Sequence, residues 1–75
     1  MDVSRQAELT ALVARAEDAA ERMYERSGGA GAYAEAKDLF GDAIALARRL
    51  GLEAYAAKLE ARLAEVKAVF RSQLG

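Results

Sequence analysis

The sequence contains no cysteine, no histidine and no proline, and its aromatic residues are limited to two phenylalanines and three tyrosines. Without thiols or imidazoles, the chain lacks disulfide bonds, the usual zinc ligands and the commonest acid–base groups of enzymes. Any catalytic mechanism would have to depend on Asp, Glu, Lys, Tyr or Ser alone. We therefore expect a protein that is not an enzyme and that binds no metal and no cofactor.

An excess of charge of one sign is also missing, because 11 basic and 12 acidic residues give a formal net charge of −1. These residues are interspersed, so no broad basic field attracts phosphate backbones, and nucleic acid is not an expected partner. No stretch approaches the roughly 20 apolar residues that cross a bilayer, and residues 1–5 lack the charged and apolar sections of a secretion signal. We expect no membrane attachment and a cytoplasmic location.

The residues that are abundant favour helices. Nineteen of the 75 residues are alanine, and Leu, Glu, Arg and Lys supply much of the remainder; all have high helix propensity. Apolar side chains recur at spacings of three and four in three segments, which predicts helices over about residues 3–26, 32–50 and 52–73. The glycine-containing segment 27–31 and Gly51 should form the turns.

The second predicted helix is apolar over an arc of roughly 160°, which is wider than contact with a single neighbour requires. We therefore expect it to lie between the other two helices. The third predicted helix has a narrower core face, made of Leu52, Ala56, Leu59, Leu63, Val66 and Phe70. Because both connections are short, residues 1–75 are predicted to form one all-α domain, an antiparallel three-helix bundle.

The segment from Gly31 to Leu46, GAYAEAKDLFGDAIAL, resembles the second half of a tetratricopeptide repeat. It has a turn glycine, an aromatic residue two positions later, and then Ala36, Phe40 and Ala43. Small residues in this order let two helices approach closely, while the aromatic side chain fills the space beside the next helix. The resemblance implies a helix-turn-helix unit followed by a third packing helix, and a role in binding other proteins. The chain is similar also to the microtubule-interacting and transport domain, a three-helix bundle of this length.

Alanines form a second row on the third predicted helix, opposite its core face. A partner helix could approach this row closely, although the high helix propensity of alanine would also account for it. A smaller group on the second helix, around a glycine within that helix, could lie against a partner's backbone. The candidate partner-binding residues are Ala54, Ala57, Lys58, Ala61, Arg62, Ala64, Ala68, Ala34, Gly41 and Ala45.

These patterns favour a small non-catalytic adaptor or scaffold module that binds a helix or peptide of another protein. The alternative is a structural subunit that assembles with itself, as a homodimer for example, because Ala7, Ala11 and Ala14 form a shorter alanine row on the first predicted helix. Acidic and basic side chains between Glu17 and Arg26 are interpreted as a solvated face with local ion pairs, each of which stabilises a helix only slightly.

Overall fold

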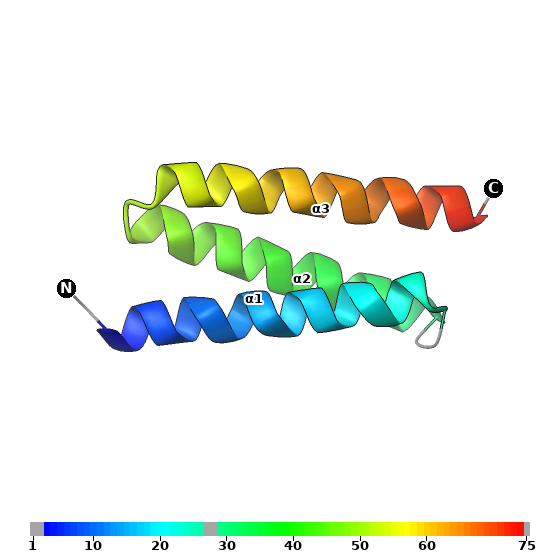
Figure 1. The fold of residues 1–75 in the computed structure, drawn as a ribbon, viewed down its shortest axis with the longest axis horizontal. Coiled ribbons are helices and arrows are strands. Elements are labelled where there is room, and N and C mark those ends of the chain that lie inside the picture. The colour runs from blue at the N-terminus through cyan, green and yellow to red at the C-terminus, as the bar shows by residue number, and fades with distance from the viewer. Residues whose placement is uncertain (1–2, 27–28, 75) are drawn as a thin grey trace.

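The computed structural model describes residues 3–26 and 29–74, which form three α-helices and no β-strand. The helices are α1 (Val3–Tyr24), α2 (Gly29–Arg49) and α3 (Glu53–Leu74). The predicted all-α, three-helix fold is confirmed. Figure 1 shows the chain passing from left to right in α1, back in α2 and from left to right again in α3, so that the two termini lie at opposite ends.

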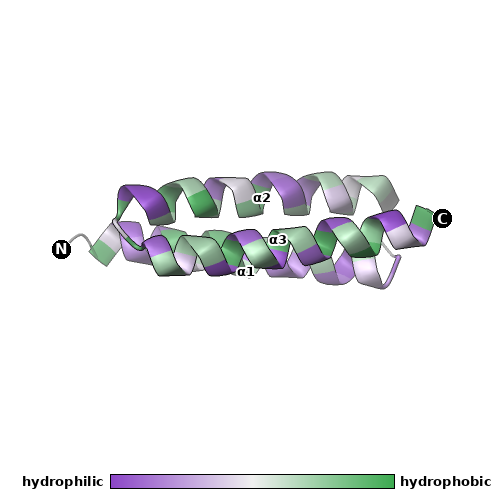
Figure 2. Ribbon diagram, turned by 90° about the horizontal axis from the view of Figure 1, so that it is seen from above, coloured by the Kyte–Doolittle hydropathy of each residue, from purple (hydrophilic) through white to green (hydrophobic). Residues whose placement is uncertain are grey.

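Helix α2 holds the fold together. It packs against both α1 and α3, whereas α1 and α3 contact each other much less. Figure 1 shows α2 between the other two helices, with α1 along one side of it and α3 along the other. Figure 2, seen from above, shows α2 set off from both. The wide apolar arc of α2 is the cause, because a helix that is apolar over more than a narrow stripe can bury two neighbouring faces at once. The expectation that this helix lies between the other two is confirmed.

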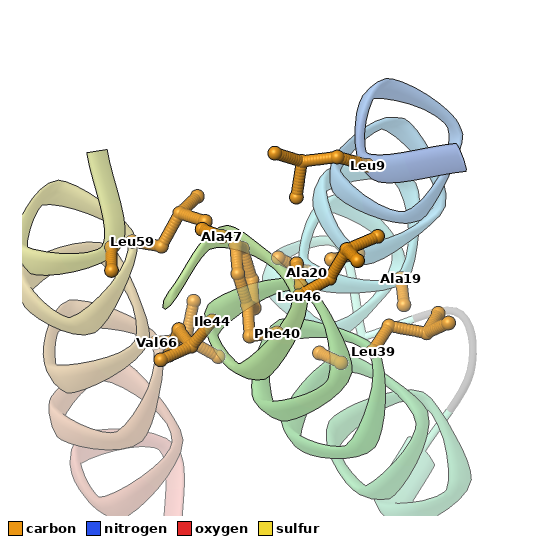
Figure 3. Packing of buried hydrophobic residues seen from close by; sticks show 14 of the residues in the cluster. Leu9, Ala19, Ala20, Leu39, Phe40, Ile44, Leu46, Ala47, Leu59 and Val66 are labelled. Carbon is orange, nitrogen blue, oxygen red and sulfur yellow. The ribbon is translucent and has the colours of Figure 1, made fainter. Parts of the chain in front are cut away.

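The core is a single cluster that combines alanines with a few larger side chains. The largest fully buried side chains are Phe40, Met23, Leu46 and Val66. Figure 3 shows Phe40 and Leu46 of α2 among side chains from both other helices. The alanines with no exposed surface are Ala16, Ala19, Ala20, Ala36, Ala43 and Ala47. Their small side chains allow the helix axes to approach closely and the larger side chains to fill the remaining space.

The start of α2 differs from the prediction. We expected a turn up to Gly31, but the helix begins at Gly29. Glycine weakens a helix least in its first turn, where the backbone N–H groups have no intrahelical partners. Helix α1 ends at Tyr24, and Arg26 adopts the positive φ of 60° that the sequence had led us to assign to a glycine. Ser27 and Gly28 of the predicted turn lie outside the described residues.

The turn between α2 and α3 is the predicted one, with Gly51 at a φ of 77°. The N–H of Gly51 donates to the carbonyl of Arg48 at 3.0 Å, and the N–H of Leu52 donates to that of Ala47 at 2.9 Å. These two bonds form a Schellman motif, which satisfies carbonyls at the end of α2. The prediction that Leu52 lies in the core is wrong, since 37% of its surface is exposed.

Candidate functional site

The outer face of α3 carries a row of exposed alanines, which we call the alanine row: Ala54, Ala57, Ala61, Ala64 and Ala68. Their spacing of three and four residues keeps them on one side of the helix. The buried residues Ala56, Leu59 and Val66 lie on the opposite side, toward α2. Helix α3 therefore presents small apolar side chains to solvent along the face that no other described helix covers.

Charged side chains border the alanine row on both sides. Lys58 and Glu65 lie on one side, and Glu60 and Lys67 lie on the other, as the turn of about 100° per residue requires. Glu60 forms an ion pair with Arg48 of α2, in which Oε2 of Glu60 lies 2.6 Å from Nη2 of Arg48. Within the described part of the chain, Lys58, Glu65 and Lys67 are exposed and form no ion pair. These three charges are therefore available to a binding partner.

Arg62, predicted to bind a partner, instead joins α3 to α1. Its Nε atom donates to both carboxylate oxygens of Glu17, at 2.9 and 3.0 Å, and its Nη2 atom donates to Glu17 Oε1 at 2.8 Å. Its Nη1 atom donates to the hydroxyl oxygen of Tyr24 at 2.7 Å, and the guanidinium also lies 5.3 Å from the centre of the Tyr24 ring. The guanidinium is thus committed within the chain, and we remove Arg62 from the set of partner-binding candidates.

Electrostatics reinforce this assignment. The hydrogen bonds that Arg62 donates to Glu17 raise the pKa of Arg62 above its ordinary value and outweigh the opposing effect of partial burial. A raised folded-state pKa means that the stability contributed by this charge is fully present below the ordinary pKa of arginine. This stabilisation would be lost only as the pH rises above the ordinary pKa of arginine. The contact therefore does not switch in the physiological range.

Three further contacts join the helices. Arg22 pairs with Glu35 at 2.6 Å between α1 and α2. The rings of Tyr33 and Phe70 stack between α2 and α3, with centroids 3.8 Å apart. The Gln73 amide donates to the carbonyl of Met23 at 3.1 Å. The charged residues Glu17 and Arg22 of α1 therefore do more than form local ion pairs along one helix.

The second group of candidates, Ala34, Gly41 and Ala45, is also exposed, on the side of α2 away from the core. A Cβ atom added at Gly41 would meet nothing within 4 Å. The isolated fold therefore does not require glycine at this position, although glycine costs about 1 kcal/mol relative to alanine in a helix interior. Leu12 and Leu46 line a hollow beside Ala45 but are partly or fully buried. The outer face of α3 differs, because larger apolar side chains are exposed at one end of it.

Two exposed side chains near the start of α3 were missed as site residues. Leu52 and Tyr55 are each 37% exposed and line a shallow hollow with Ala54 and Lys58. This hollow continues the alanine row toward the turn at Gly51. Leu52 lies in the turn before α3 and not within that helix, which spacing alone does not reveal. Tyr55 lies off the predicted core face, and the sequence indicates it as a possible amphipathic contact residue, although it is outside the candidate set.

The described residues include no group of three or more acidic side chains placed to hold a metal ion. None of the helices α1, α2 and α3 is long and apolar enough to span a bilayer. Comparisons of the chain with models of protein families, with curated proteins and with solved structures found no match. The functional argument therefore depends on the surface of the molecule itself.

Proposed function

We propose that this chain is a non-catalytic protein-interaction module that binds an α-helix or helical peptide of a partner protein along the outer face of α3. The observation that carries the proposal is the alanine row, whose five members are all exposed on a side of α3 that no described helix covers. The resemblance of residues 31–46 to tetratricopeptide modules, which bind other proteins, supports the same class of function.

The physical properties of the face suit a helix as the ligand. Alanine side chains permit an interaxial distance near the lower end of the range of about 8–10 Å for packed helices. No charged group stands within the row, so little desolvation opposes binding. Leu52 and Tyr55 add larger apolar surface at one end, and Lys58 supplies a cation at the edge. The ligand should therefore be amphipathic, with small residues facing the row.

Photo-crosslinking tests this proposal. A lysine analogue that bears a diazirine and keeps the ammonium group is introduced at Lys58, beside the row, or at the control position Lys37 on α2. In extracts of cells that carry the gene, we expect protein adducts from position 58 and few from position 37. Ala61→Glu should lower the yield at position 58 by about ten-fold, because it places a charge in the contact.

The matched control is Ala11→Glu, which makes the same change at an exposed alanine of α1 and should leave the yield unchanged. Both variants should retain full helicity by circular dichroism, because glutamate is a good helix former at exposed positions. Equal adduct yields at positions 58 and 37, or adducts that do not respond to Ala61→Glu, would rule out the outer face of α3 as the binding surface.

A further inference from the structure

The charges beside the alanine row repeat with the same period as the row itself. Lys58 and Glu65 are seven residues apart on one side, and Glu60 and Lys67 are seven residues apart on the other. On each side the two charges are opposite in sign. Flanking charges at this period pair across the contact when two helices pack along a seven-residue repeat, and they set which partner binds and in which orientation.

An antiparallel copy of α3 satisfies this pattern. In an antiparallel pair, each flank of one helix faces the same flank of the other. When Ala61 packs against Ala64 of the second copy, and Ala57 against Ala68, Lys58 falls beside Glu65 of that copy. In the same register Glu60 falls beside Lys67 of the second copy, and its carboxylate can accept from both this lysine and Arg48. Each of these four charges then meets an opposite charge, and two-fold symmetry repeats each pair. Glu53, which lies seven residues before Glu60 on the same flank, falls beside the uncharged Leu74.

Other arrangements of two copies bring like charges together. In a parallel pair, one flank of each helix faces the other flank of its neighbour, which places Glu60 beside Glu65 of the second copy. An antiparallel pair shifted by one repeat places Lys58 against its own counterpart and Glu60 against its own. Like charges at these positions oppose binding. Glu53 meets Lys58 in the first of these arrangements and Lys67 in the second, but these attractions only offset the repulsions. Charge complementarity is therefore greatest in one orientation and one register.

We propose that the partner of the alanine row is a second copy of this chain, bound antiparallel along α3 in a two-fold symmetric dimer. This proposal depends on the proposed function and names the partner of the same surface. Because one pair of helix faces falls near or below the roughly 1,200 Å² of a stable interface, the dimer is reversible, with a dissociation constant on the order of 10–100 µM.

Two charge-reversal variants test the dimer by sedimentation equilibrium. Lys58→Glu and Glu65→Lys each replace two attractive pairs by two repulsive ones, so each variant should dimerise about ten-fold more weakly than the wild type. An equimolar mixture of the two variants should form a heterodimer of wild-type affinity, because each then supplies the charge that the other lacks. Labelling one variant identifies the mixed species.

The control Arg15→Glu changes the net charge as much as Lys58→Glu does, at an exposed site on α1, and should not alter dimerisation. Three results would overturn the proposal: a wild-type chain that stays monomeric at ~1 mM, a Glu65→Lys variant that dimerises more tightly, or a mixture that forms no heterodimer. If the chain is monomeric but Lys58 still captures a different protein, the dimer is wrong and the helix-binding function stands. If the chain neither dimerises nor captures another protein at Lys58, both the dimer and the helix-binding function are wrong.

Discussion

Replacing Phe40 with alanine is expected to lower the free energy of unfolding by about 3–5 kcal/mol. The side chain has no exposed surface and lies on α2, the helix that contacts both others. Its removal would leave a cavity that the close-packed helices cannot fill. A domain of this length has a total stability of only about 4–11 kcal/mol, so the substitution should remove a large fraction of the stability of the fold. Urea denaturation followed by circular dichroism measures the change.

Tyr55→Ala provides the comparison, since Tyr55 is an aromatic residue that is 37% exposed on α3. Its loss should cost much less than the loss of Phe40, about 1 kcal/mol or less. Similar costs for the two variants would show that Phe40 does not occupy the centre of the core. The packing of α1 and α3 onto α2 would then need to be reconsidered.

Replacing Arg62 with methionine is expected to destabilise the chain by about 1–2 kcal/mol. Methionine keeps an apolar stem but loses the hydrogen bonds to Glu17 and Tyr24. The effect is smaller than for a fully buried ion pair because the side chains of Arg62 and Glu17 are 27% and 43% exposed. Thermal or urea denaturation measures the change.

A double-mutant cycle with Glu17→Gln separates this pair from other effects of the substitutions. The coupling between the two positions should account for a large part of the cost of Arg62→Met. Dimerisation, or capture of a partner at Lys58, should survive Arg62→Met under conditions where the variant remains folded. Zero coupling would contradict the role of Arg62 as a link between α1 and α3, and a specific loss of binding would return it to the set of binding residues.

Much of the fold could be predicted because it depends on local periodicity. The spacing of Phe40, Leu46 and their neighbours predicts both a helix and the breadth of its buried face, and that breadth predicts two neighbours. Gly51 identifies its turn because only glycine readily takes the required positive φ. The start of α2 at Gly29 could not be predicted so directly, because glycine in the first turn of a helix looks the same in a sequence as glycine in a loop.

The candidate site was predicted in part, and the difference has a physical reason. Exposure of an alanine row follows from its angle to the core residues of the same helix, which the sequence contains. The contact between Arg62 and Glu17 joins residues 45 positions apart, and depends on how α1 and α3 are each placed against α2. No pattern within one helix specifies how two other helices are placed relative to each other. The sequence therefore could not show that Arg62 is bound to Glu17 within the chain while Lys58 forms no ion pair.

Nuclear magnetic resonance of the alanine methyl groups tests most directly whether the outer face of α3 is where this protein meets its partner. The probes already lie on all three candidate surfaces: Ala57, Ala61 and Ala64 on α3, Ala11 on α1 and Ala45 on α2. As the concentration of the chain or of a captured partner is raised, the α3 methyl signals should shift while those of Ala11 and Ala45 stay in place. Shifts at Ala11 or Ala45 with unchanged α3 signals would contradict the account.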